Sequence, residues 1–113
     1  MKVAKSLNGQ SIAIIGLGAS GKAAARLAFE KGGEVYVSEM RTDKEACSGA
    51  SQLRNIGIEV ELGPHVEERI ASAGTVVISP GIPHDTGIVR KLADNGISTI
   101  SEPEFAFRFF EGP

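Results

Sequence analysis

The chain has 113 residues, a formal net charge of −2, 42% hydrophobic residues and 23% charged residues. This length suits one domain with a hydrophobic core, and the composition is that of an ordinary globular protein. The balanced charge argues against nucleic acid as a partner, and no apolar run approaches the roughly 20 residues that span a bilayer. The single cysteine, Cys47, excludes an internal disulfide bond and fits a reducing cytoplasm.

The segment 12–22 joins an apolar run to a glycine-rich turn and a helix-prone stretch. In the pattern G-x-G-x-x-G, Gly16 allows a sharp turn, Gly18 lets a diphosphate approach the backbone, and Gly21 lets the helix pack closely on the sheet. The amides of residues 19–22 should open a helix and attract an anion. With Glu39 after the next strand, this context predicts phosphate or nucleotide binding.

Strands and helices alternate along the chain. Residues 1–9 are a lead-in, and residues 10–113 form one domain. We expect strands at about 11–16, 34–38, 58–62, 75–79 and 97–101. We expect helices at about 20–31, 44–56, 66–72 and 85–95, and a phenylalanine-rich helix after Pro103. This order predicts a Rossmann-like three-layer α/β sandwich, with a five-stranded, mainly parallel sheet and helices on both faces.

The acidic strand 58–62 should lie near a sheet edge, with Glu59 and Glu61 pointing to solvent. Cys47 should be a small packing residue, because nothing near it in the sequence activates a thiol. His65 and His84 are interpreted as loop histidines without a catalytic role, since neither has metal-ligand companions.

Three loops should meet at the carboxyl edge of this sheet, where ligands bind in folds of this kind. They are the segments Gly16–Gly21, Glu39–Arg41 and Ser79–Pro83. Their sequences, G-L-G-A-S-G, S-E-M-R and S-P-G-I-P, resemble those of the N-terminal domain of the Mur ligases. The similarity covers about residues 10–110 and is greatest to the members that add D-glutamate to UDP-N-acetylmuramoyl-L-alanine.

This resemblance implies that the domain holds the UDP end of UDP-N-acetylmuramoyl-L-alanine, in cytoplasmic peptidoglycan precursor synthesis. In the full enzyme, ATP with Mg²⁺ phosphorylates the substrate carboxylate, and an amine then attacks the acyl phosphate. The ATP-binding and C-terminal domains belong to the remainder of such a protein. The chain has no G-x-x-x-x-G-K-[ST] motif. We therefore expect no cofactor, no catalytic residue and no metal ligand in this domain, and no ligase activity from it alone.

The resemblance also assigns substrate-binding residues. Leu17, Ala19 and Ser20 would surround the uridine and diphosphate, and the amides of residues 20–22 would bind phosphate. Glu39 would accept hydrogen bonds from the uracil edge, although this position is often Asp in the family and Met40 replaces a residue that is often polar. The full predicted set is Gly16, Leu17, Gly18, Ala19, Ser20, Gly21, Lys22, Glu39, Met40, Arg41, Ser79, Pro80 and Gly81.

Two alternatives remain open from the residues. The first is an NAD(P)-binding domain of an oxidoreductase or regulatory sensor, in which Glu39 would hold the adenosine ribose hydroxyls. This alternative gives no account of S-P-G-I-P. The second is an interaction module that binds no nucleotide. Preference between uridine and adenine nucleotides would separate the first from the Mur ligase interpretation.

Overall fold

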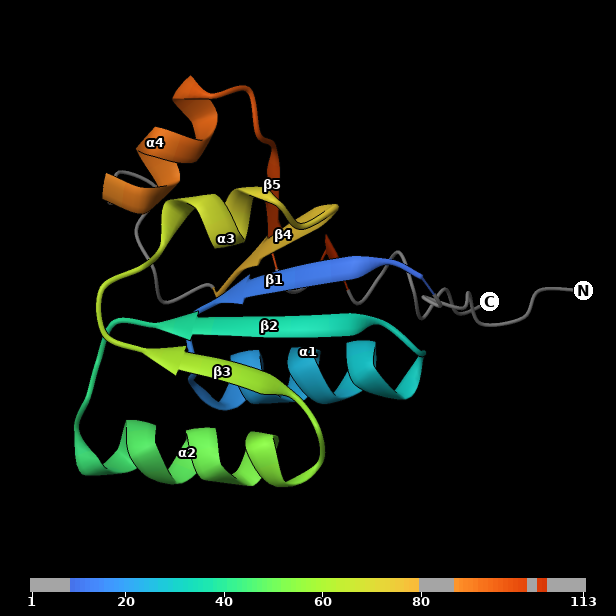
Figure 1. Cartoon of the computed structure of the whole chain (residues 1–113), viewed down its shortest axis with the longest axis vertical. Helices are drawn as coiled ribbons and strands as arrows, with labels where there is room; N and C mark the ends of the chain where they lie inside the picture. The colour runs from blue at the N-terminus through green and yellow to red at the C-terminus, as the bar shows by residue number, and fades with distance from the viewer. Residues whose placement is uncertain (1–8, 80–86, 102–103, 106–113) are drawn as a thin grey trace, which may run out of the picture.

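The sheet has five parallel strands in the order β3-β2-β1-β4-β5 (Figure 1). The structure is a computed structural model that describes residues 9–79, 87–101 and 104–105. The strands are β1 (Ser11–Ile15), β2 (Glu34–Glu39), β3 (Glu59–Leu62), β4 (Thr75–Ile78) and β5 (Thr99–Ser101). The helices are α1 (Ala19–Glu30), α2 (Lys44–Asn55), α3 (Glu67–Ala71) and α4 (Gly87–Asp94).

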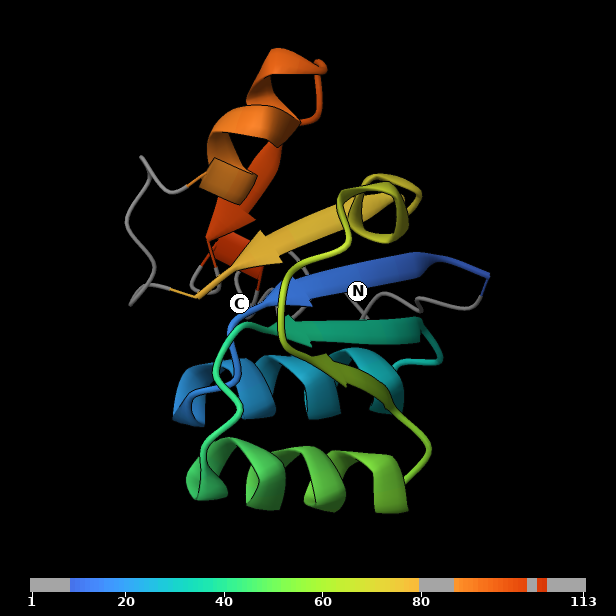
Figure 2. The ribbon, with the colours of Figure 1, turned by 60° about the vertical axis from the view of Figure 1, so that its left-hand side comes forward.

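Helices cover both faces of the sheet, and each face has its own hydrophobic core. Successive side chains of a strand point to opposite faces, so Ile12 and Ile14 join the core under α1 and α2. Ala13 and Ile15 join the core under α3 and α4. Figure 2 shows the two helix pairs on opposite sides of the sheet. The nearly continuous apolar character of β1 therefore reflects burial on both faces.

The expected fold class is confirmed, and the sheet is parallel throughout the described ranges. Helix and strand ends differ from the expected ones by one or two residues, as is usual at frayed ends. Of the phenylalanine-rich helix, the described residues are Glu104 and Phe105, and Phe105 is fully buried. No helix in the described part of the chain is long and apolar enough to cross a membrane.

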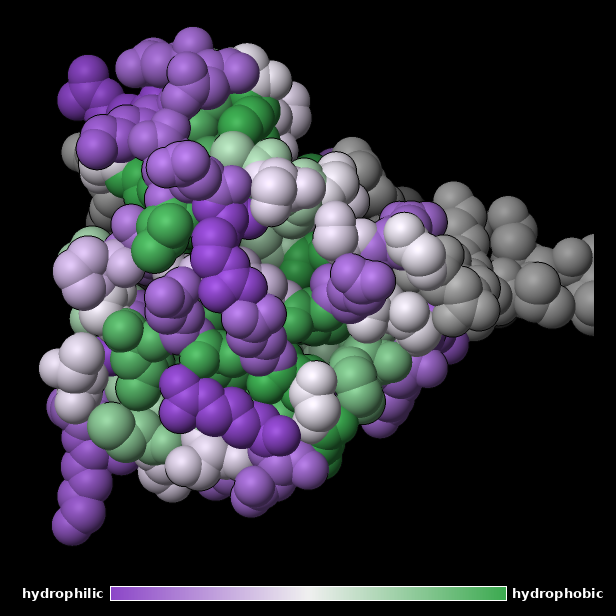
Figure 3. Space-filling view, viewed as in Figure 1, coloured by the Kyte–Doolittle hydropathy of each residue, from purple (hydrophilic) through white to green (hydrophobic). Residues whose placement is uncertain are grey.

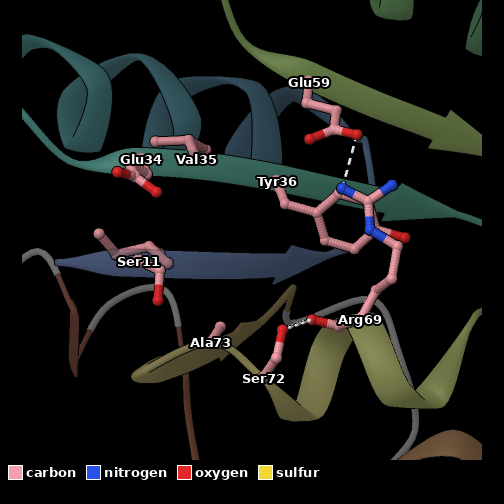
Figure 4. Close-up of a pocket in the computed structure, with 9 residues that line it drawn as sticks. Ser11, Glu34, Val35, Tyr36, Glu59, Arg69, Ser72 and Ala73 are labelled. Carbon is pink, nitrogen blue, oxygen red and sulfur yellow. Dashed lines mark hydrogen bonds and ion pairs between the residues drawn. The ribbon is translucent and has the colours of Figure 1, made fainter.

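The edge position expected for β3 is confirmed, and its acidic side chains reach solvent as expected. Glu59 and Glu61, whose side chains are 57% and 39% exposed, also pair with Arg69 of α3, at 2.5 and 3.8 Å. The guanidinium of Arg69 lies 4.2 Å from the ring centroid of Tyr36 (Figure 4). The hydroxyl of Tyr36 donates to Glu61 at 2.5 Å. These polar groups cover the part of the sheet that α3 leaves open.

This coverage gives the surface over β2 and β3 a mixed character. Figure 3 shows hydrophilic and hydrophobic residues interleaved there instead of gathered into one apolar patch. Cys47 also differs from its expected packing role, because it lies exposed on α2. The apolar stripe of α2 is formed without it, by Ala46, Ala50 and Leu53.

Candidate functional site

Two of the three expected loops are joined directly at the carboxyl edge of the sheet, and the third begins beside them. The amide of Gly16 donates to the carbonyl of Ser38 at 2.9 Å, which joins the end of β1 to the end of β2. The amide of Ser79 donates to the carbonyl of Ile15 at 3.0 Å, which places the start of the third loop next to β1. Pro80 and Gly81 lie outside the described residues. The central position of β1 between β2 and β4 explains this convergence.

The glycine-rich loop adopts the strand–turn–helix geometry expected from its sequence. Gly16 has a φ of 107°, a left-handed conformation that glycine adopts without a Cβ clash. Gly18 is the extended N-cap of α1. The first three helical residues, at positions 19–21, have amides with no partner inside the helix. The amide of Lys22, expected to be free, donates to the carbonyl of Gly18 at 2.9 Å. Three amides, and not four, are therefore available to an anion.

The outer side of this loop is open at Gly18. A Cβ built on Gly18 would meet nothing within 4 Å. Leu17 points the other way: its side chain is buried and lies against Gly49 of α2. Any contact of Leu17 with a ligand would therefore be made through its backbone. Ala19 and Ser20 are exposed beside Gly18, so the loop presents backbone and small side chains outward.

The carboxylate of Glu39 joins the first two loops. Its Oε1 atom accepts the amide of Leu17 at 2.7 Å, and its Oε2 atom accepts the amide of Arg41 at 2.8 Å. Glu39 is only 8% exposed, so these bonds satisfy a carboxylate that has lost most of its contact with water. The sequence placed Glu39 at the site but could not show that it binds two backbone amides within its own chain.

Arg41 and Met40 lie outward from Glu39. The guanidinium of Arg41 lies within 4 Å of Glu39, Asp43 and Glu45, and the negative charge of Glu39 is the largest cause that raises the pKa of Arg41. Met40 is 60% exposed, so its side chain is accessible to a partner.

A pocket of about 240 Å³ opens beside Met40. Its walls come from the ends of β2 and β3 and from the starts of α3 and α4. Its lining residues are Met40, Pro64, His65, Glu67, Gly87, Ile88 and Lys91. This pocket brings in the loop after β3, which the sequence analysis did not assign to the site. The signal for it was available: Gly63-Pro64-His65 also follows the carboxyl end of a parallel strand.

Two hydrogen bonds fix the loop after β3 to the end of β2. The amide of Gly63 donates to the carbonyl of Glu39 at 2.8 Å. The hydroxyl of Ser38 and Nδ1 of His65 form a 2.6 Å hydrogen bond. Partial burial of His65 lowers its pKa, and this effect outweighs the opposing influence of Glu39. The imidazole is therefore neutral near pH 7.

Other features of the described residues offer no comparable site. Within the described ranges, no group of three or more His, Cys, Asp or Glu residues could hold a metal ion. A second pocket, of about 180 Å³, lies toward the opposite edge of the sheet among Ser11, Tyr36, Glu59, Arg69 and Ser72 (Figure 4). The guanidinium of Arg69 in this pocket already forms ion pairs with Glu59 and Glu61 of β3.

Fold and site together define a Rossmann-like α/β domain with an open helix N-terminus and an acidic residue at the end of the second strand. The family model of the Mur ligase MurD-like N-terminal domain matches residues 10–101. The chain therefore belongs to the MurD-like Mur ligase N-terminal domain family.

Curated relatives carry the same assignment. The UDP-N-acetylmuramoylalanine–D-glutamate ligase of Desulfatibacillum aliphaticivorans is 35% identical over 107 residues, which cover 95% of this chain and 24% of that protein. The ligase of the same name from Bacteroides fragilis is 44% identical over 98 residues, which cover 87% of this chain and 22% of that protein. The chain thus spans about a quarter of the length of these relatives.

Solved structures show the same fold. A murein peptide ligase from Psychrobacter arcticus matches with a TM-score of 0.75 and 22% identity, over 88% of this chain and 20% of that one. UDP-N-acetylmuramate–alanine ligase MurC from Thermotoga maritima matches with a TM-score of 0.73 and 18% identity, over 90% of this chain and 23% of that one. Shikimate dehydrogenase from Aquifex aeolicus matches with a TM-score of 0.53 and 15% identity, over 95% of this chain and 50% of that one.

Proposed function

We propose that this domain binds the uridine diphosphate end of UDP-N-acetylmuramoyl-L-alanine, as part of an ATP-dependent ligase that joins D-glutamate to that substrate. The curated relatives are named for this reaction. ATP and Mg²⁺ would act in other domains of the same protein, which works in the cytoplasm on peptidoglycan precursors. The present chain alone would bind the substrate without converting it.

The observation that carries the proposal is the open start of α1 beside Glu39. The backbone at Gly18 has free space on its outer side, and the next three amides lack helical partners. Such amides, at the positive end of a helix dipole, favour phosphate groups. Ser20 adds an exposed hydroxyl at the same place. The diphosphate would therefore lie across Gly18 and the first turn of α1.

The uracil base would lie between Glu39 and the pocket beside Met40. The imide edge of uracil has one N–H group between two carbonyls. A carboxylate has about four lone-pair sites, so Glu39 can hold two backbone amides and still accept that N–H group. Met40, Ile88 and Pro64 give the adjoining pocket apolar walls suited to a base. Ser79 would border the uridine from the end of β4, with Pro80 and Gly81 after it.

A dinucleotide is the second candidate ligand, because an acidic residue after β2 also suits ribose hydroxyls. The fold alone does not separate the two, since it extends to a dehydrogenase. The motif of the third loop and the family membership favour the uridine ligand.

Titration of the chain with four ligands, followed by backbone amide NMR shifts, tests the proposal. The ligands are UDP-N-acetylmuramoyl-L-alanine, UDP, NADH and NADPH. We expect shifts in the amides of residues 16–22 and 39–41 and of Ser79 and Gly81, on either side of Pro80, with the two uridine ligands only. Shifts in the first two segments with NADH or NADPH instead would replace the proposal with a dinucleotide-binding function. No shift with any of the four would contradict nucleotide binding by this chain.

A further inference from the structure

The last two residues of β2 contact two different loops at once. On one side, the carbonyl of Ser38 accepts the amide of Gly16, and the carboxylate of Glu39 accepts the amide of Leu17. On the other side, Ser38 and Glu39 bind the loop after β3 through His65 and Gly63. The glycine-rich loop and the loop after β3 do not need to touch each other to be coupled, because both are attached to the same two residues.

The hydroxyl of Ser38 is an unusual group in this position. Ser38 is 1% exposed and lies in an inner strand of the sheet, next to β1 and β3. A buried hydroxyl without a partner is destabilising, because it loses its hydrogen bonds to water. His65 supplies one partner at 2.6 Å, and the phenol of Tyr36 on the same strand is a second hydrogen-bonding neighbour of Ser38. A serine hydroxyl both donates and accepts, so the bond can form with either neutral tautomer of the imidazole.

We propose that His65 is a positioning residue of the nucleotide site, which acts through Ser38 on the backbone that holds the glycine-rich loop. The proposal rests on the nucleotide binding proposed above. It adds a residue from the loop after β3, 27 positions away from Ser38 in the sequence. His65 fixes the end of β2, and the end of β2 sets where the amides of Gly16 and Leu17 lie.

The geometry explains why loss of the Ser38–His65 bond should weaken ligand binding. Rotation of the Ser38 peptide would move the carbonyl that holds Gly16, and it would also move the base of the Glu39 side chain. Both changes alter the loop that ends at the open N-cap Gly18. A ligand that bridges α1 and the end of β2 depends on the relative placement of these two elements, so loosening their junction weakens its binding.

The test uses the chain of 113 residues with UDP as the probe and isothermal titration calorimetry as the readout. The variants are Ser38→Ala, His65→Leu, the double variant and His65→Asn, which restores a polar side-chain atom near the position of Nδ1. Ser11→Ala is the matched control. It removes another serine hydroxyl that bonds a neighbouring loop, the 3.0 Å bond from the amide of Gly74, at the opposite edge of the sheet.

We expect Ser38→Ala and His65→Leu each to weaken UDP binding about three- to tenfold, the usual effect of one hydrogen bond. The double variant should bind no more weakly than the worse single variant, because both changes break the same bond. His65→Asn should recover most of the affinity, and Ser11→Ala should bind as the wild type does. Unchanged affinity in the folded single variants, or fully additive losses, would overturn the proposal.

A second readout needs no ligand and keeps this inference distinct from the proposed function. Hydrogen exchange of the Gly16 and Leu17 amides should be faster in Ser38→Ala and His65→Leu, relative to core amides of β1 and β4 in the same sample. If the wild type does not bind UDP, the proposed function fails and this exchange measurement alone decides the role of His65. Equal exchange in all variants would then overturn it.

Discussion

The amide of Leu17 donates a 2.7 Å hydrogen bond to Oε1 of Glu39, across 22 positions of the sequence. This bond ties the glycine-rich loop to the loop after β2, and it does so from a nearly buried side chain. Since the second oxygen of the same carboxylate holds the amide of Arg41, one side chain organises backbone on both sides of the proposed ligand.

Replacement of Glu39 by Ala should weaken binding of uridine nucleotides by more than tenfold. The loss of one hydrogen bond to a charged group costs about 1.5–3 kcal/mol, and Leu17 and Arg41 would also lose their acceptor. Calorimetric titration with UDP measures the effect. Glu30→Ala, an exposed acidic residue at the far end of α1, is the matched control and should leave affinity unchanged. A folded Glu39→Ala chain with wild-type affinity would show that this carboxylate has no part in the site.

Gly18 and Gly63 should respond in opposite ways to alanine. A Cβ at either position meets nothing within 4 Å, but Gly63 has a φ of 109° and Gly18 has an ordinary extended conformation. Gly63→Ala should therefore lower the free energy of unfolding by about 1–2 kcal/mol. Gly18→Ala should change stability little and UDP affinity greatly, because its methyl group would occupy the path of the diphosphate. Denaturant unfolding and calorimetry measure the two effects. Tight UDP binding by Gly18→Ala would contradict the proposed diphosphate position.

Stability should depend on pH through His65. Burial lowers its pKa in the folded chain, so the unfolded chain binds more protons as the pH falls below the ordinary value of about 6.5. Neutral His65 contributes fully to the stability of the folded chain above that value. This contribution is lost as the pH falls through the lowered pKa of His65 in the folded chain. Glu39 at the end of β2 is the charge that opposes this shift in the pKa of His65, and Glu67 of α3 and Lys91 of α4 line the same pocket as His65.

The measurement is the free energy of unfolding between neutral and mildly acidic pH, compared between the wild type and His65→Asn. The variant should show a shallower loss of stability as the pH falls. The other histidine, His84, is present in both proteins, so the difference between their curves isolates His65. Identical curves would mean that His65 titrates equally in the folded and unfolded chains.

Tyr36 offers an independent check of the polar cluster on the sheet. Burial is the main cause that raises the pKa of its phenol to about 12, and the hydrogen bond to Glu61 adds to it. The folded chain therefore keeps this proton longer than the unfolded chain, and stability should fall as the pH rises above about 10.

The chain has one tyrosine and no tryptophan, so phenolate absorbance reports Tyr36 alone. Glu61→Gln should lower the midpoint of the titration toward 10, because it removes a negative charge at the hydroxyl. Glu59→Gln is the matched control. Glu59 pairs with Arg69, and it is not one of the groups that raise or lower the pKa of Tyr36. Equal midpoints in the two variants would contradict the structural pairing of Tyr36 with Glu61.

Local patterns were enough to predict the fold class, the glycine turn after β1 and the place of Glu39 at the carboxyl edge of the sheet. The alternation of apolar runs with helix-prone stretches repeats along the chain and is readable from residues close in sequence. The turn at Gly16 and the acid at position 39 are also local features, so both were predicted. The parallel arrangement follows because each pair of strands is joined through a helix.

Side-chain pairing was decided only by the tertiary structure. Glu59 and Glu61 follow an alternating pattern that indicates a wet face, and only the tertiary structure shows that α3 brings Arg69 to both of them there. His65 meets Ser38 because β2 and β3 run in register and the chain turns back over the end of β2. These contacts join residues that are from 8 to 27 positions apart. Sequence periodicity shows which face of its own element a residue occupies, but the partner on that face depends on how the elements pack.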